Sequence, residues 1–348
     1  MDNTKENLPF RSQEILNWLV LDYIQTAEPI GSRTIARKYF KRLSSATIRN
    51  VMSDLEESGY LASPHTSAGR IPTDKGLRFY VDTLVKQREL SDIEKEEIRQ
   101  RYPLPEEGLR SLVKKTSHVL ATFSQYVGLV VTPKWKQTIF KHMEFLPLSQ
   151  KRLLGIFVTQ SGWVRNRILE VEQDFTHADL EKMNNYCNKV FYGLSLEEAK
   201  TKIKKELEED QNHYDRLLSK ALVFAATVLK PAEEAELFLE GESQLFNHPE
   251  FAEIEKVQKL VNVLEEKQKI LTLLECADKS PDVQIFIGSE NSNLSLENVS
   301  MVTAQYKKAD EIFGTLGVIG PKSMDYARVI PIVDFTAKLL GDFLTMTA

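Results

Sequence analysis

Six basic side chains and no acidic one lie between Pro29 and Ser53, in a chain of 348 residues with a net charge of −5. They are Arg33, Arg37, Lys38, Lys41, Arg42 and Arg49. Cationic side chains neutralise phosphates and release counterions, so a local excess of positive charge is the electrostatic mark of a nucleic-acid-binding surface. Residues 1–90 hold 13 basic and 11 acidic residues, which leaves −7 for the remainder. We therefore expect double-stranded DNA to bind at the amino-terminal end.

Side chains suited to reading bases lie at the start of a helix that we expect from Ser44 to Gly59. Its apolar residues recur at i, i+3, i+4 and i+7 and so share one buried face. Arginine and asparagine pair with guanine and adenine, and a recognition helix reads bases with its N-terminal residues. The expected base-reading residues are Ser45, Thr47, Arg49 and Asn50. For this segment alone, an ordinary amphipathic helix with a solvated face is the less favoured alternative.

The neighbouring segments predict a support for this helix. A first helix is expected over residues 12–26 and ends before Pro29, because the residue before a proline leaves the helical conformation. A short second helix follows the turn at Gly31-Ser32. Two strands, residues 60–62 and 70–71, flank a polar loop, and a further helix follows Pro72-Thr73. Three helices and a small hairpin make a winged helix-turn-helix. Its expected phosphate and wing contacts are Ser32, Arg33, Lys41, Arg42, His65, Ser67 and Arg70.

Four sequence blocks carry a family resemblance: residues 28–33 (EPIGSR), 43–52 (LSSATIRNVM), 59–61 (GYL) and 64–73 (PHTSAGRIPT). In order, spacing and length they resemble the HrcA family of bacterial heat-inducible transcription repressors. Three later blocks are similar more thinly, namely 247–251 (NHPEF), 287–291 (IGSEN) and 320–326 (GPKSMDY). Lys322-Ser323 departs from the Thr-Arg expected in the last block.

The resemblance implies a multidomain α+β protein in which a GAF-like domain is interrupted by an inserted α+β dimerisation domain. The expected divisions are a winged-helix domain (1–88), a helical linker (89–105), a GAF-like domain (106–139 and 231–348) and the insert (140–230). It also implies a function. The chain would bind the CIRCE inverted repeat ahead of groE- and dnaK-type operons as a homodimer, repress them and be released on heating, with GroE chaperonin as a partner.

The pattern of the remaining two-thirds predicts mixed strands and helices. Expected strands are 127–132, 140–146, 153–159, 163–171, 283–287, 300–306 and 314–319. Expected helices are 109–123, 178–192, 196–208, 212–229, 250–274 and a last one from Tyr326. We expect the apolar faces of the insert's helices to be buried at a homodimer interface. A helix-turn-helix that reads an inverted repeat needs a two-fold dimer, which predicts a homodimer independently of the family.

The sequence contains no motif typical of a metal site, a hydrolase or a phosphate-binding loop. Six histidines are scattered without an HExxH motif, the two cysteines are far apart, and no GxSxG motif is present. Gly314, Gly317 and Gly320 form GxxGxxG, which is no phosphate-binding fingerprint, and we expect them at strand turns. We therefore expect no enzyme activity, no metal and no cofactor. The longest apolar run, 221–229, is too short to span a bilayer, so a cytoplasmic protein without membrane contact is expected.

Two alternatives stay open. One is a ligand-gated winged-helix regulator of other genes that uses the GAF-like domain as its sensor. The other is a structural or chaperone-binding module with incidental DNA affinity.

Overall fold

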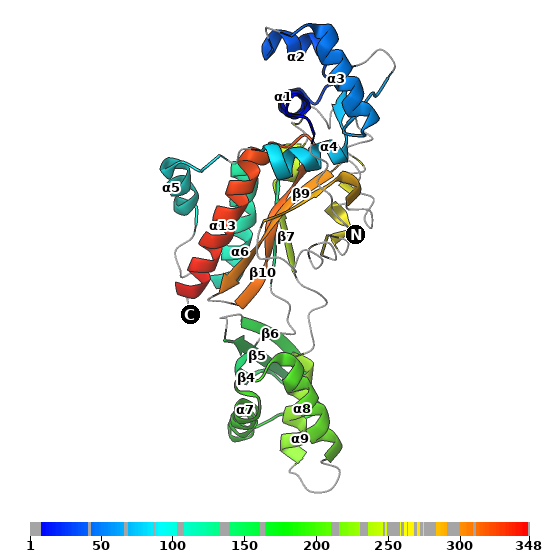
Figure 1. Ribbon diagram of the computed structural model, residues 1–348. Helices are drawn as coiled ribbons and strands as arrows, with labels where there is room; N and C mark the ends of the chain where they lie inside the picture. The colour runs from blue at the N-terminus through cyan, green and yellow to red at the C-terminus, as the bar shows by residue number, and fades with distance from the viewer. Residues whose placement is uncertain are drawn as a thin grey trace.

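The computed structural model is an α+β protein (Figure 1). It describes residues 8–40, 43–65, 69–85, 88–102, 108–132, 139–160, 164–209, 216–229, 236–245, 283–290, 299–308 and 311–346, with isolated positions between 248 and 274. Within this part of the chain, no helix combines the length and the apolar character that crossing a membrane requires. The helix expected over 250–274 falls largely outside the described residues.

The described residues from 8 to 85 form a small unit, here called the amino-terminal unit. Its elements are α1 (Phe10–Thr26), α2 (Ser32–Lys38), α3 (Ser45–Glu57), β1 (Leu61–Ala62), β2 (Ile71–Pro72), α4 (Asp74–Phe79) and a π-helical segment (Tyr80–Leu84). β1 and β2 pair antiparallel, and Ile30 adds a bridge to Arg70. Apolar side chains of α1, α2 and α3 are fully buried between the helices, among them Leu16, Ile35 and Ile48. The helices and the hairpin expected in this region are therefore present.

A five-stranded antiparallel sheet forms the centre of the molecule, with strand order β7-β3-β10-β9-β8. Its strands are β3 (Val127–Val131), β7 (Leu237–Glu240), β8 (Gln284–Ile287), β9 (Val299–Lys308) and β10 (Glu311–Pro321). The helices of this part are α5 (Asp92–Gln100), α6 (Gly108–Ser124), α10 (Glu242–Leu245) and α13 (Tyr326–Met346). In Figure 1, α6 and the red helix α13 lie side by side along the sheet. The edge strand β7 was not predicted from the sequence.

The three glycines of the GxxGxxG pattern lie inside β10, so the expectation that they serve turns was wrong. A Cβ on Gly317 would lie 2.4 Å from the carbonyl oxygen of Val302, and one on Gly314 would lie 2.5 Å from that of Val131. Glycine is required here because neighbouring strands leave no space for a side chain.

A second sheet, with order β4-β5-β6, lies at the opposite end of the molecule from α3 (Figure 1). Its strands are β4 (Phe140–Ser149), β5 (Arg152–Thr159) and β6 (Val164–Glu170), followed by helices α7 (His177–Phe191), α8 (Leu196–Glu209) and α9 (Arg216–Val228). Side chains from 140 to 229 form a hydrophobic core of their own, which includes Phe145, Phe157, Met183 and Leu222. The rest of the described core is a separate cluster that runs through the amino-terminal unit and the central sheet.

Exposed apolar side chains of this second part lie on its sheet, at Leu148, Val164 and Ile168, and on α9, at Val223. The expectation that apolar helix faces are buried between two copies stays a prediction. Apolar residues of α7, α8 and α9 pack against the inner face of the sheet. On the outer face, Ile168 lies opposite Leu154 and Val164 lies opposite Val158 in the strand register. Ile168 is 54% exposed and Val164 is 65% exposed. Successive side chains of a strand point to opposite faces of the sheet, and β5 has apolar residues at both sets of positions. The helices cover one of these faces, so apolar side chains on the other face stay accessible.

Candidate nucleic-acid interface

Helix α3 presents polar residues to solvent at its N-terminal half and buries its other face. Ile48, Met52 and Leu55 are buried, whereas Arg49 and Asn50 are exposed. This orientation follows from the 3.6-residue period, because the polar and apolar positions fall on opposite sides of the helix. Both side chains predicted to make bidentate base contacts are therefore accessible.

The start of α3 is fixed by a side-chain cap. Ser44 precedes the helix, and its hydroxyl oxygen accepts a hydrogen bond from the backbone amide of Thr47 at 3.0 Å. The hydroxyl of Thr47 lies 2.9 Å from that of Ser44, so it belongs to the cap in this structure. Ser45 and Thr47 are half-buried. The helix ends where Gly59 adopts a φ of 77°, as the sequence predicted.

A buried carboxylate holds α2 against α1. Asp22 is 1% exposed and accepts hydrogen bonds from the ammonium of Lys38 at 2.9 Å and the hydroxyl of Tyr39 at 2.5 Å. The ring of Tyr39 stacks on Trp18 with centroids 4.1 Å apart. Burial and the hydrogen bond to Asp22 raise the pKa of Tyr39 to about 12. The positioning role of Asp22 was not predicted from the sequence. The sequence feature that could have indicated it is the position of Asp22, an acid on the apolar face of α1 three residues after Leu19.

The hairpin is tied to α3 by an ion pair. The guanidinium of Arg70 lies 2.7 Å from the carboxylate of Glu56 on α3 and donates a further hydrogen bond to the hydroxyl of Ser63 at 3.2 Å. Glu56 was the second residue that the sequence analysis did not assign. Arg70, expected to contact phosphate, is in this structure the residue that orients the hairpin relative to α3. His65 is exposed in the loop between the strands.

The other predicted phosphate contacts differ in accessibility. Arg33 is exposed in the first turn of α2, whereas Ser32 beside it is only 9% exposed. Lys41, Arg42 and Ser67 lie outside the described residues. Arg37, in the last turn of α2, is a further exposed cation to which the sequence analysis gave no role.

The described surface of the amino-terminal unit carries exposed hydrogen-bond donors. Among the residues that the structure describes, no group of three or more His, Cys, Asp and Glu side chains is placed to hold a metal ion. What α2 and α3 offer is guanidinium and amide groups at the surface, which suit phosphate oxygens and base edges.

Comparisons with known proteins identify the family of the chain. A family model described as the HrcA protein C-terminal domain matches residues 110–330. The heat-inducible transcription repressor HrcA of Geobacter sulfurreducens is 42% identical over 334 residues, which cover 96% of this chain and 97% of that protein. The HrcA of Syntrophobacter fumaroxidans is 39% identical over 340 residues, which cover 97% and 98%. A solved structure described as a hypothetical protein is 21% identical with a TM-score of 0.66, covering 98% of this chain and 100% of that one, and so shares the fold.

Fold and surface together define an α+β protein whose small helical unit presents arginine and asparagine on a capped helix, carried on a larger sheet-containing body. The curated relatives of this sequence are transcription repressors, which places the chain in the class of transcription regulators. The chain belongs to the HrcA family of heat-inducible transcription repressors, because near-full-length relatives share 37% to 42% of its residues.

Proposed function

We propose that this chain is a homodimeric repressor that binds the CIRCE inverted repeat ahead of groE- and dnaK-type chaperone operons and is released on heating. The observation that carries the proposal is the exposure of Arg49 and Asn50 on the N-terminal half of a capped helix. In the proposal, Arg49 and Asn50 read base edges, with Ser45 and Thr47 beside them. Bound at the operator, the repressor would block the start of transcription.

The phosphate contacts of the proposal come from the residues around α3. Arg33 and Arg37 of α2 are exposed, and Lys41, Arg42, His65 and Ser67 belong to the segments that flank α2 and the hairpin. The first 88 residues would thus act as a winged helix-turn-helix, with β1, β2 and their loop as the wing. Phosphate contacts fix the register of the protein on the duplex without reading its sequence.

The remaining divisions are also proposals. Residues 106–139 and 231–348 would form the GAF-like domain, and 140–230 the inserted dimerisation domain. The separate core of residues 140 to 229 supports the latter division. The outer face of β4-β5-β6 supports its role, because it exposes Ile168, Val164 and their neighbours, and an apolar face of this kind is stabilised by a second copy.

GroE chaperonin enters the proposal as a partner that keeps the repressor active. Chaperonin occupied by unfolded proteins would then leave less active repressor on the operator. This would link the amount of unfolded protein to transcription of the chaperone operons.

The test is fluorescence anisotropy of the purified protein on a CIRCE duplex and on a scrambled duplex. Both are measured at one salt concentration near 0.15 M, since phosphate contacts make affinity salt-dependent, below and above a heat-shock temperature, with and without chaperonin. We expect binding to CIRCE alone, lost on heating. Equal weak binding to both duplexes with chaperonin present would contradict the proposed operator.

Substitution of Arg49 tests which residue reads bases. Arg49→Ala should weaken CIRCE binding by about 1–3 kcal/mol and bring it closer to binding of scrambled DNA, because a bidentate base contact is lost. Arg33→Ala should weaken binding to both duplexes alike and flatten the salt dependence. Lys202→Ala on α8, which removes an exposed cation far from α3, is the control and should bind as wild type. Identical behaviour of Arg49→Ala and Arg33→Ala would refute this division of roles.

A further inference from the structure

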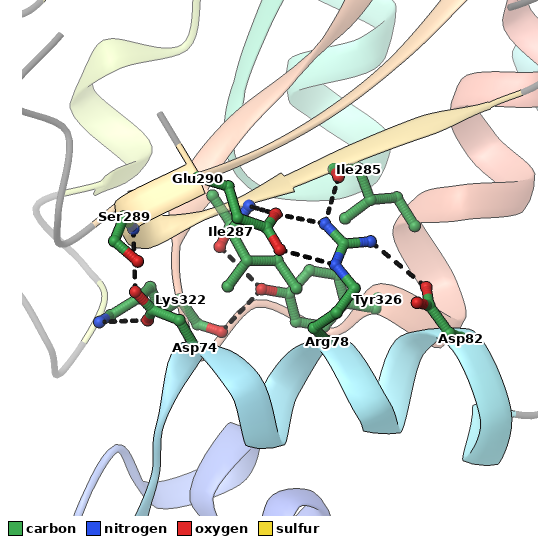
Figure 2. Close-up of polar contacts among 10 residues, drawn as sticks. Asp74, Arg78, Asp82, Ile285, Ile287, Ser289, Glu290, Lys322 and Tyr326 are labelled. Atoms are coloured by element: carbon green, nitrogen blue, oxygen red, sulfur yellow. Dashed lines mark hydrogen bonds and ion pairs between the residues drawn. The ribbon is translucent and has the colours of Figure 1, made fainter. Parts of the chain in front are cut away.

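Two of the carboxy-terminal sequence blocks, around residues 287–291 and 320–326, meet the amino-terminal unit at helix α4. α4 follows directly after the hairpin, and its polar partners in the central part of the molecule lie more than 200 positions later in the chain. Figure 2 shows Asp74 and Arg78 on α4 and Asp82 on the π-helical segment that continues it, with Asp74 and Arg78 facing Ser289, Glu290 and Lys322. Nothing in the proposed DNA contacts uses these groups.

The first contact holds the start of α4. One carboxylate oxygen of Asp74 accepts a hydrogen bond from the ammonium of Lys322 at 2.8 Å, and the other accepts one from the backbone amide of Ser289 at 2.9 Å. Gly288 makes the approach possible, because a Cβ at this position would lie 2.6 Å from both carboxylate oxygens. The side chains of Asp74 and Lys322 are each 22% exposed. The Asp74–Lys322 ion pair is therefore largely shielded from solvent, and each carboxylate oxygen of Asp74 has its own donor.

The second contact lies one turn further along α4. The guanidinium of Arg78 forms a two-pronged ion pair with Glu290, with Nε 2.8 Å from one carboxylate oxygen, and donates to the carbonyl oxygen of Ile285 at 2.5 Å. The backbone amide of Ile287 donates to the carboxylate of Glu290 at 2.9 Å, which helps to fix the orientation of that carboxylate. Arg78 also lies 3.3 Å from Asp82 in the π-helical segment that follows α4.

The two pairs have opposite polarity. α4 contributes the anion of the first pair and the cation of the second, while the central part contributes Lys322 and Glu290. Sliding or rotating α4 by one turn would place like charges together, which is unfavourable. The arrangement therefore specifies one position of α4 on the central sheet.

On its other side, α4 is fixed to the C-terminal end of α3. The hydroxyl of Thr73 donates to the carbonyl oxygen of Gly59 at 2.7 Å, and the backbone amide of Thr73 donates to the carbonyl oxygen of Tyr60 at 3.1 Å. A Cβ on Gly76 would lie 2.1 Å from the carbonyl oxygen of Tyr60, so helix and strand are in direct contact. The orientation of α3 relative to the central sheet thus follows from the orientation of α4.

We propose that Asp74, Arg78, Glu290 and Lys322, here called the α4 clamp, set the angle at which each α3 is presented and thereby determine the half-site spacing that the dimer accepts. The inference rests on the proposed function, since only a dimer on an inverted repeat has a spacing to match. The clamp residues are positioning residues and touch no DNA. Their loss should relax the spacing requirement and leave the binding of one half-site intact.

The experiment compares full-length wild type, Arg78→Gln, Glu290→Gln and the double variant on three duplexes. These are the operator, the operator with its spacer lengthened by about 5 bp, half a helical turn, and a single half-site. Arg78→Gln should lower affinity for the operator by about tenfold, the size expected for a lost charge-assisted pair, and leave half-site affinity unchanged. The preference for the normal spacer should fall accordingly, and the double variant should be no worse than either single one. Asp82→Asn, which removes only the partner of Arg78 in the adjoining π-helical segment, is the matched control.

Hydrogen exchange gives a readout without DNA. Backbone amides of Ile287 and Ser289 donate into the clamp, so they should exchange faster in Arg78→Gln and Asp74→Asn, while α1 keeps its protection. Unchanged exchange would overturn the clamp, and equal losses on operator and half-site would overturn its role in spacing. If wild type does not prefer the operator over scrambled DNA, the proposed operator fails and the spacing role fails with it. Exchange then still decides whether the clamp exists.

Discussion

At the scale of single residues, several acidic side chains near the proposed interface form ion pairs within the protein. Asp22 binds Lys38, Glu56 binds Arg70, and Asp74 binds Lys322. The cations that remain exposed among the described residues of α2 and α3 include Arg33, Arg37 and Arg49. Acids near a DNA-binding surface would repel phosphates unless they were paired. The pairing therefore separates positioning charges from those available to DNA.

The titration of Asp74 gives a prediction at this scale. Burial by itself raises the pKa of Asp74, but the hydrogen bonds from Lys322 and Ser289 outweigh burial and hold the pKa below its ordinary value. A carboxyl whose pKa is lower in the folded state stabilises the fold above its unfolded pKa, roughly 4, and loses that effect as pH falls through the folded value.

Urea unfolding of wild type and Asp74→Asn between pH 7 and pH 3 checks this expectation. The wild type should be the more stable at pH 5 to 7, and the difference should shrink progressively below about pH 4 as Asp74 is protonated. Asp334→Asn, which breaks the exposed pair with Lys338 on α13, is the control and should show a smaller difference. A difference that is constant down to pH 3 would contradict an ionised Asp74 in the clamp.

At the scale of elements, α4 is the connection between the helix proposed to read bases and the central sheet. It is short, running only from Asp74 to Phe79 before the backbone widens into the π-helical segment Tyr80–Leu84. Its N-cap Thr73 accepts a hydrogen bond from the amide of Gly76 at 3.1 Å. So short a helix is not stable by itself. Its conformation depends on contacts at both of its sides.

Gly76→Ala tests the packing of α4. The added methyl group would meet the carbonyl oxygen of Tyr60 at 2.1 Å, so the backbone must move. We expect a loss of about 1–3 kcal/mol in the free energy of unfolding, the usual cost of overpacking, despite the better helix propensity of alanine. Chemical denaturation followed by circular dichroism measures it. Gly31→Ala has nothing within 4 Å of the new atom and should change stability by less than about 0.5 kcal/mol. Equal midpoints for both variants would contradict a close contact between α4 and Tyr60.

At the scale of the whole molecule, the surface proposed for DNA and the surface proposed for dimerisation lie at opposite ends. Figure 1 places α3 at one end and the β4-β5-β6 sheet with α7, α8 and α9 at the other, with the central sheet between them. Contacts of a second copy on β6 would therefore act on α3 through the central sheet and α4. In a dimer joined at β6, a rigid α4 clamp would hold the two α3 helices at a fixed separation.

Ile168→Glu tests the dimer surface. A charge in place of an apolar side chain that is 54% exposed should cost the monomer fold little, whereas buried between two copies it would be unpaired and unfavourable. We expect a shift from dimer to monomer in analytical ultracentrifugation, with loss of operator affinity and retention of half-site affinity. Ile93→Glu on α5, where the side chain is 74% exposed, is the matched control and should leave the dimer intact. An unchanged sedimentation coefficient for Ile168→Glu would move the interface elsewhere.

The sequence by itself determined the local elements and the chemistry at the amino-terminal end. The 3.6-residue pattern of Ile48, Met52 and Leu55 settles which side of α3 is buried, and Ser44 and Gly59 mark its ends, because caps and periodicity depend on neighbours in the chain. Family membership likewise follows from motif order and spacing. The clustering of Arg33, Arg37 and Arg49 needs no fold to be noticed, although their roles toward DNA stay predictions.

Only the tertiary structure decided which residues meet across long separations. Asp74 and Lys322 are 248 positions apart, and no periodicity links an acid on one helix to a lysine in a later loop. The same holds for the glycines of β10, whose necessity comes from strands that pair beside them. It also holds for the open face of the β4-β5-β6 sheet, since β5 is apolar on both faces and its sequence does not show which face is covered. These features arise from packing between distant segments, which local propensity does not encode.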